Sequence, residues 1–187
     1  MMIKFRLLFT LAALISFSSI YSKTEKFYIV EMKTNKGEIV LKLSNRTPLH
    51  RDNFVKLCKE KFYDNVLFHR VIEGFMIQAG DPQSKSHSMD ITLGDGELPF
   101  KVDAEIVPGM FHRRGVLAAA REGDSFNPER KSSSTHFYIV TGKVYTDADL
   151  NKAAARIAKA NRLTEYTFPD EIVKVYKSEG GAPHLDT

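Results

Sequence analysis

The hydrophobic and polar positions near the start of the chain predict a β-hairpin followed by a helix. Residues 27–34 are rich in β-forming side chains and residues 38–43 alternate polar with apolar ones, so the turn is expected at 35–37. Thr47-Pro48 then predicts the N-terminus of a helix that runs to about Lys59, because proline is tolerated at the first helical position. Four residues are expected on its buried face: Leu49, Phe54, Leu57 and Cys58.

A second alternating stretch over 68–82 predicts two short strands joined by a tight turn at Glu73-Gly74. Alternation places Arg70 on the same face as its apolar neighbours two positions away on each side. A guanidinium there is costly unless it has a partner or a task. The simplest alternative is an ordinary amphipathic hairpin whose arginine is salt-bridged. After the turn, an aromatic ring, a flexible thioether and an amide lie within four residues of each other: Phe75, Met76 and Gln78.

The middle of the chain alternates between polar loops and short apolar runs. Loops are expected over 84–96 and 123–131, and short strands over 97–105 and 115–121. A further strand is expected over 136–140, where Phe, Tyr, Ile and Val follow one another. These segments predict a mainly β protein.

A helical period returns in the last quarter of the chain. Asp147 is expected to cap a helix over 148–161. One face of this helix carries apolar residues: Leu150, Ala154 and Ile157. A second, shorter helix is expected over 169–177, ending before Gly180-Gly181. The two form a predicted helical hairpin.

Composition places the chain among ordinary globular proteins. Its 187 residues are enough for one domain with a real core, and 43% are hydrophobic and 27% charged. Much of the net charge of +4 comes from Lys4 and Arg6, so 25 basic residues face 23 acidic ones in the rest. No basic run is interleaved with aromatic residues, which argues against nucleic acid as a partner.

Residues 1–22 have the composition of a secretory signal. Lys4 and Arg6 precede an apolar run over 7–17 that is short for a membrane span, and small serines follow it. Cleavage is expected after Ser22, which predicts an exported, periplasmic protein without stable membrane association. The alternative is an uncleaved N-terminal membrane anchor.

The thiol and imidazole content predicts no bound metal. Cys58 is the one cysteine of the sequence, so no internal disulfide can form, and its helical spacing favours a small packed residue. The six histidines show no metal-ligand spacing with each other or with this cysteine.

Four segments resemble those of the cyclophilins, which are peptidyl-prolyl cis-trans isomerases. Residues 68–72 read Phe-His-Arg-Val-Ile, and residues 74–81 read Gly-Phe-Met-Ile-Gln-Ala-Gly-Asp. Residues 115–121 and 136–140 are similar to two further strands of the family. The resemblance implies a cyclophilin-like antiparallel β-barrel over 27–187, with the helical hairpin, approximately 147–179, inserted and packed outside it. It also implies a monomer that acts on proline-containing polypeptides and needs no cofactor.

The resemblance also implies which residues act. Arg70 would donate to the prolyl nitrogen, and Gln78 would hold the substrate backbone and Arg70. Substrate-binding positions would be Phe75, Met76, Ala120, Arg121, His136, Tyr138 and Leu185. Of these, Tyr138 would form the floor of the proline pocket, while His136 stands where the family commonly has glutamine. Met76 also fits plain core packing.

Residues 181–186 resemble the family segment that precedes the groove histidine and the closing strands. Because the sequence ends at Thr187, the barrel is expected to be incomplete at its C-terminal end. An alternative function therefore stays open, a truncated, non-catalytic binder of proline peptides or a chaperone. An isomerisation assay on a short Xaa-Pro peptide separates the two.

Overall fold

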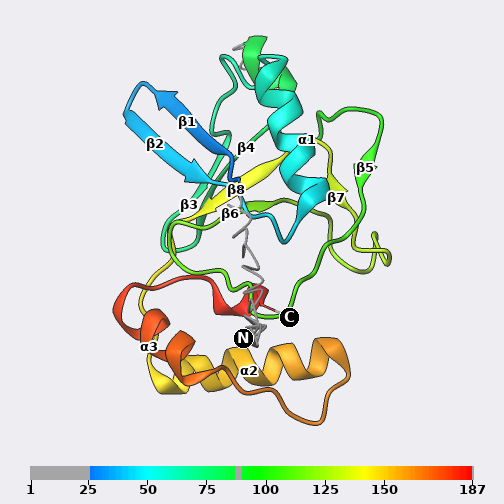
Figure 1. The fold of residues 1–187 in the computed structure, drawn as a ribbon. Helices are drawn as coiled ribbons and strands as arrows, with labels where there is room; N and C mark the ends of the chain where they lie inside the picture. Colours follow the sequence, from blue (N-terminus) through cyan, green and yellow to red (C-terminus); the bar gives the residue numbers. More distant parts are fainter. Residues whose placement is uncertain (1–25, 87–89, 187) are drawn as a thin grey trace, which may run out of the picture.

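The computed structural model describes residues 26–86 and 90–186, and the proposed signal over 1–22 lies outside this part. Eight strands and three α-helices follow one another (Figure 1). The strands are β1 (Ile29–Thr34), β2 (Gly37–Lys42), β3 (Arg70–Ile72), β4 (Met76–Ala79), β5 (Lys101–Val102), β6 (Leu117–Ala119), β7 (Ser132–Ser133) and β8 (Phe137–Val140). The helices are α1 (Pro48–Lys59), α2 (Asp147–Asn161) and α3 (Asp170–Ser178), with short 3-10 turns at Pro82–Ser86 and Pro183–Leu185.

The strands form three antiparallel sheets. The central sheet has four strands in the order β3-β4-β8-β6, and β1-β2 and β5-β7 form two-stranded sheets. This confirms the predicted class, mainly antiparallel β with helices, and both predicted hairpins. The pairing of the described strands does not close into one continuous barrel.

Helix α1 has the predicted bounds, but its N-terminus is capped differently from the prediction. Thr47 makes no side-chain cap; instead the backbone N–H groups of Leu49 and His50 donate to the Glu105 carboxylate at 3.0 and 2.9 Å. A carboxylate suits this place because the first helical N–H groups lack intrahelical partners. Leu49 is 52% exposed rather than buried, since the helix turns it away from the core.

An aromatic cluster joins α1 to the central sheet. Phe137 of β8 makes edge contacts with Phe54, Tyr63 and Phe68, with ring centroids 5.3 to 6.3 Å apart. Edge-to-face pairs of this kind add to the stabilisation from apolar burial. At the end of β4, Gly80 has a φ of +111°, and a Cβ there would lie 2.2 Å from the carbonyl oxygen of Thr135. Glycine therefore lets β4 and β8 approach at this point.

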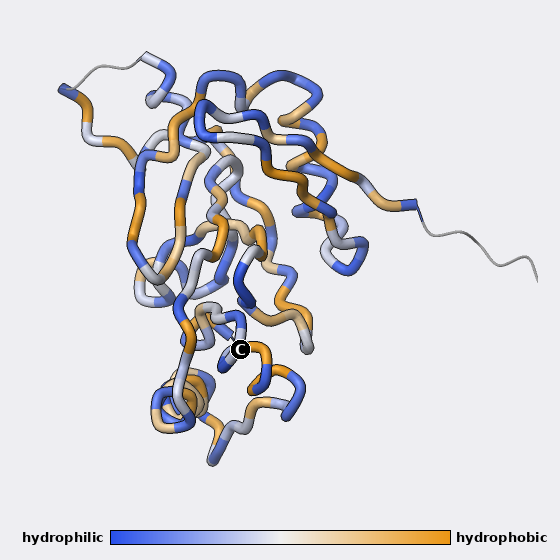
Figure 2. Tube along the Cα trace, turned by 90° about the vertical axis from the view of Figure 1, so that its left-hand side faces the viewer, coloured by the Kyte–Doolittle hydropathy of each residue, from blue (hydrophilic) through white to orange (hydrophobic). Residues whose placement is uncertain are grey.

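Helices α2 and α3 form the predicted hairpin at one end of the molecule, beyond the central sheet, in both views (Figures 1 and 2). Thr146, not Asp147, is the N-cap of α2, in a capping box with Asp149. The hairpin has its own core of buried residues: Leu150, Ala153, Ile157, Phe168, Ile172 and Tyr176.

The segment after α3 returns to the rest of the protein. Gly181 bridges Arg113 and Lys143, and the N–H of Ala182 donates to the carbonyl of His112 at 2.8 Å. This return brings residues 183–186 beside a loop that leads into β6. Within the described residues, no helix has both the length and the apolar composition needed to cross a membrane.

Candidate active site

A cavity of about 1320 Å³ lies between the central sheet and the helical hairpin. Its walls come from β3, β4, β6 and β8, from the loops at 104–113 and 121–124, and from α2, α3 and residues 184–186. Eight of the nine predicted site residues line it: Arg70, Phe75, Met76, Gln78, Ala120, Arg121, Tyr138 and Leu185. The fold thus gathers residues from four separate segments around one space.

Arg70 and Gln78 face each other across the β3–β4 pair. Nη1 of Arg70 donates to Oε1 of Gln78 at 3.0 Å. A guanidinium carries five N–H donors in a fixed plane, so this one bond orients the group and leaves donors for a substrate. Arg70 is exposed, which makes it accessible to a peptide in the cavity.

The apolar part of the cavity lies next to this pair. Tyr138 is opposite Gln78 in the β4–β8 register, and Met76 is 1% exposed. The Phe75 ring lies 5.1 Å from the ring of His184. Burial raises the pKa of Tyr138 to about 12, so its phenol is neutral at physiological pH. The cavity therefore offers a neutral aromatic surface beside a fixed cation.

His136 does not line the cavity, so its predicted contact with substrate is not supported by its position. It is 7% exposed, and its ring lies 5.5 Å from that of His69. Its N–H donates to Ser133 Oγ at 3.1 Å, within the turn before β8 begins at Phe137. Burial, and then the neighbouring His69, lower the pKa of His136 and favour its neutral form.

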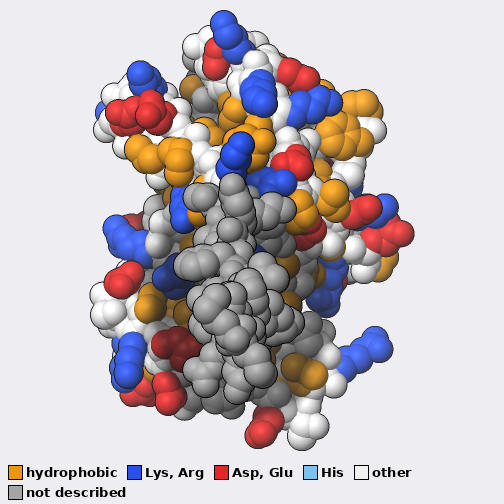
Figure 3. All heavy atoms as spheres, in the orientation of Figure 1, with side chains coloured by type: hydrophobic (Ala, Val, Ile, Leu, Met, Phe, Trp, Pro, Cys, Tyr) orange, Lys and Arg blue, Asp and Glu red, His pale blue; other side chains and the backbone are white. Residues whose placement is uncertain are grey.

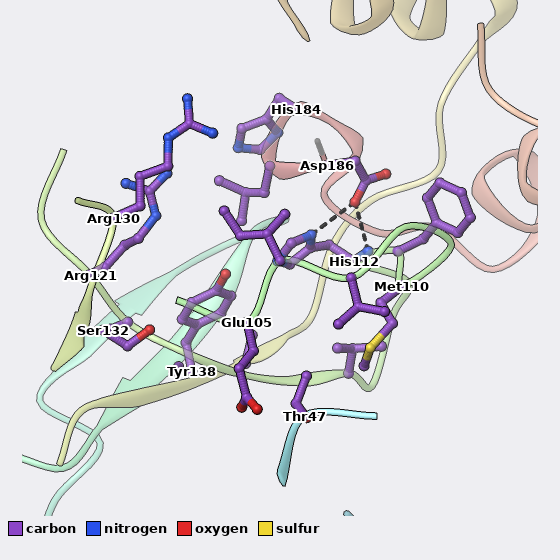
Figure 4. A pocket seen from close by; sticks show the side chains of 18 of the residues that line it. Thr47, Glu105, Met110, His112, Arg121, Arg130, Ser132, Tyr138, His184 and Asp186 are labelled. Atoms are coloured by element: carbon purple, nitrogen blue, oxygen red, sulfur yellow. Dashed lines mark hydrogen bonds and ion pairs between the residues drawn. The ribbon is translucent and has the colours of Figure 1, made fainter. Parts of the chain in front are cut away.

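The Asp186 carboxylate, which the sequence did not single out, forms a largely buried network at the wall of the cavity. It accepts a hydrogen bond from the N–H of His112 at 2.8 Å and lies 2.8 Å from His112 Nδ1 (Figure 4). Tyr176 of α3 donates its hydroxyl to the second carboxylate oxygen at 2.5 Å. The His112 ring is stacked on Tyr138, with centroids 6.2 Å apart and planes 10° apart. The network thus joins the helical hairpin to the floor of the cavity.

Helix α2 also contributes directly to the cavity, through Arg156, Ile157, Ala160 and Asn161. The hairpin lies outside the sheets as expected, yet it forms part of the cavity wall. Near it, Arg121 and Arg130 both pair with Asp124, at 2.5 and 3.0 Å. No sequence signal indicated that α2 faces the site, because the phase of a helix toward a distant cavity depends on tertiary packing.

The ionisable side chains of the described part of the chain do not gather as metal ligands do. Within residues 26–86 and 90–186, no group of three or more His, Cys, Asp or Glu is arranged to hold an ion.

Comparison with known proteins identifies the family. Residues 29–164 match the family described as cyclophilin type peptidyl-prolyl cis-trans isomerase/CLD. A protein of Staphylococcus haemolyticus assigned as a peptidyl-prolyl cis-trans isomerase is 32% identical over 159 residues, covering 84% of this chain and 69% of that protein. A Streptococcus pyogenes protein assigned as a bifunctional phosphatase and isomerase is 30% identical, covering 84% of this chain and 29% of that one.

Solved structures agree with this fold. A cyclophilin-type isomerase of Cryptosporidium parvum superposes with a TM-score of 0.51 at 24% identity, covering 86% of this chain and 92% of that one. A second structure of that protein, determined in the presence of the dipeptide Ala-Pro, has a TM-score of 0.50 at 22% identity and covers 82% and 91% of the two chains. Together with the family match, these findings show that the chain belongs to the cyclophilin-type peptidyl-prolyl cis-trans isomerases.

Proposed function

We propose that the cavity accelerates rotation about Xaa-Pro bonds of polypeptides through a hydrogen bond from Arg70 to the twisted prolyl nitrogen. The uncatalysed rotation crosses a barrier of roughly 18–20 kcal/mol because the amide is stabilised by resonance. It takes tens to hundreds of seconds, which is slow enough to limit folding. A catalyst needs only to bind the twisted amide better than either planar form.

Arg70 supplies that preference. When the amide twists, the prolyl nitrogen regains its lone pair and becomes a hydrogen-bond acceptor. A preorganised donor aimed at this position stabilises the transition state and does little for the planar states. The observation that carries the proposal is the Arg70–Gln78 hydrogen bond of 3.0 Å at the wall of the cavity, which fixes the donor before substrate arrives.

The neighbouring apolar residues divide the work with Arg70. Phe75, Met76, Tyr138 and Leu185 line the same cavity and would hold the proline ring still while the preceding carbonyl swings. Gln78 would also contact the substrate backbone. The Cryptosporidium parvum isomerase was crystallised in the presence of the dipeptide Ala-Pro, which supports proline peptides as substrates of this chain.

The test is the variant Arg70→Ala, assayed on a short Xaa-Pro peptide with cis-trans isomerisation as the readout. We expect kcat/KM to fall by about 100-fold or more, the usual cost of losing one preorganised donor. Arg114→Ala is the matched control, because Arg114 is exposed and does not line the cavity. Full activity of Arg70→Ala would remove this residue from the mechanism. Proline-peptide binding without turnover in the unmodified protein would favour a non-catalytic binder.

We also propose that the substrates are exported proteins that fold after secretion. This proposal is supported by the basic start, apolar run and small residues of 1–22. Expression of the full chain in a Gram-negative host, followed by fractionation and N-terminal sequencing, tests it. A periplasmic product beginning at Lys23 is expected. A cytoplasmic product that retains Met1 would contradict export.

A further inference from the structure

The wall of the cavity is rich in arginine. Six arginines line it: Arg46, Arg70, Arg113, Arg121, Arg130 and Arg156. By contrast, basic and acidic side chains are interspersed over the visible outer surface in Figure 3. The cavity therefore concentrates cationic side chains where a polypeptide substrate would lie.

Most carboxylates of the same wall already have partners. Glu105 binds the N-terminus of α1 and His50, and Glu122 pairs with Lys101 at 2.5 Å. Asp186 is held by His112 and Tyr176. Among the described residues, none of these three acids forms a salt bridge with an arginine of the wall. With Asp124 and Glu171, five carboxylates face six arginines, so the wall has a small excess of positive charge.

Arg121 and Arg130 share one carboxylate, that of Asp124, so the trio has an excess positive charge. Figure 4 shows both arginines on one side of Tyr138. Their side chains are 32% and 28% exposed, which shields them partly from solvent and leaves room for a ligand. Each guanidinium retains donors that match the two oxygens of a further carboxylate.

Arg156 brings a third cation from the helical hairpin. Asn161, five residues further along α2, accepts a hydrogen bond from Arg130 Nη1 at 3.5 Å. At a rise of about 1.5 Å per residue, Arg156 is displaced by roughly 7.5 Å along the helix axis from this contact. Arg156 is exposed at the cavity wall, and among the described residues no salt bridge joins it to an acid. Burial lowers the pKa of His184 first, and the nearby charge of Arg156 lowers it further.

We propose that Arg156, together with Arg121 and Arg130, binds a carboxylate side chain that flanks the proline of the substrate. The preferred substrates are then polypeptides with Asp or Glu next to proline. This inference rests on the proposed function, since it names the substrate class of the same cavity. It assigns to the hairpin a part in substrate selection, because Arg156 belongs to α2.

The experiment compares matched peptides that contain Glu-Pro, Gln-Pro, Pro-Glu or Pro-Gln and are otherwise identical. We expect either the Glu-Pro or the Pro-Glu peptide to exceed its glutamine partner by about fivefold in both affinity and kcat/KM at low salt, a typical upper value for a partly exposed ion pair. The ratio should approach one at high salt, because ions screen such pairs. Arg156→Gln should remove most of the fivefold preference for the glutamate peptide over the glutamine peptide. The control Arg114→Gln should leave this preference unchanged.

The two readouts separate this inference from the proposed function. The ratio of dissociation constants, measured by fluorescence anisotropy, decides whether a carboxylate is preferred even if no peptide is turned over. Equal affinity for the glutamate and glutamine peptides at both positions would overturn the inference, whatever the turnover. An unchanged ratio in both Arg156→Gln and Arg121→Gln would overturn it as well. Absence of turnover on the glutamine peptides would count against the proposed isomerase mechanism only.

Discussion

Replacing Asp186 with alanine is expected to weaken the link between the helical hairpin and the floor of the cavity. The side chain of Asp186 is 1% exposed and lies against His112 and Tyr176. Its removal leaves the N–H of His112 and the hydroxyl of the fully buried Tyr176 without their acceptor. Buried donors that lose their partner carry the cost of desolvation without compensation.

The magnitude follows from these contacts. Each hydrogen bond to a charged acceptor contributes about 1.5–3 kcal/mol to the free energy of unfolding. Because the two donors stay buried and find no new acceptor, the variant should lose the full contribution of both bonds. A domain has a net stability of about 5–15 kcal/mol, so Asp186→Ala should remove a large share of it.

Urea denaturation at pH 7 measures the effect, with Asp186→Asn as the matched control. Asparagine retains one oxygen and the size of the side chain, so its cost should be about 1–2 kcal/mol. Tyr176→Phe removes one bond, and a double-mutant cycle with Asp186→Ala should give a coupling energy of at least about 1 kcal/mol. Because His112 stacks on Tyr138, KM for a proline peptide should also rise.

An Asp186→Ala variant whose unfolding midpoint in urea matches that of the unmodified protein would refute this reasoning. A coupling energy near zero in the cycle would show that Tyr176 and Asp186 act independently.

Three further changes test other parts of the fold. Glu105→Gln should destabilise the protein by about 1 kcal/mol at pH 7, the usual cost of a lost helix cap. Burial raises the pKa of Glu105, but hydrogen bonds from the start of α1 outweigh burial and leave the pKa lowered. The stabilisation by this carboxylate is therefore lost as pH falls below the ordinary glutamate range. The difference in urea midpoint between the unmodified protein and Glu105→Gln should accordingly shrink in acid. Burial lowers the pKa of His136, so the folded protein keeps this ring neutral at pH values where the unfolded chain, with an ordinary histidine pKa of about 6.5, has begun to bind the proton. The protein should therefore lose thermal stability from pH 7 to pH 5, and His136→Gln should lose less. Replacing 147–179 with a short Gly/Ser linker should lower kcat/KM by at least about tenfold, since the hairpin supplies cavity wall and a partner of Asp186; activity within a few-fold would show that the hairpin is dispensable.

Local patterns in the sequence predicted the parts of the fold that depend on neighbours in the chain. Helix α1 begins at Pro48 and ends at Lys59 as expected, because a proline at the first position and a helical apolar period are both local signals. The hairpin around Glu73-Gly74 follows from alternation and turn chemistry in the same way. The family resemblance then supplied eight residues that line one cavity.

Features that depend on distant parts of the chain were not predictable in this way. Glu105 caps a helix that begins 57 residues earlier, and Asp186 contacts His112, 74 residues away. No periodicity relates such positions. His136 does not line the cavity, because its ring is buried beside that of His69, and no local signal in the sequence indicates this packing.

The helical hairpin contacts the site in two physically different ways. Arg156 offers a charge at the cavity wall, whose effect on a substrate should weaken with salt. Tyr176 acts through a buried hydrogen bond to Asp186, which salt screens little. A variant that impairs activity only at low ionic strength therefore acts through the first route, and one that impairs it at every ionic strength acts through the second. Measuring each variant across a salt series separates substrate selection from support of the cavity floor.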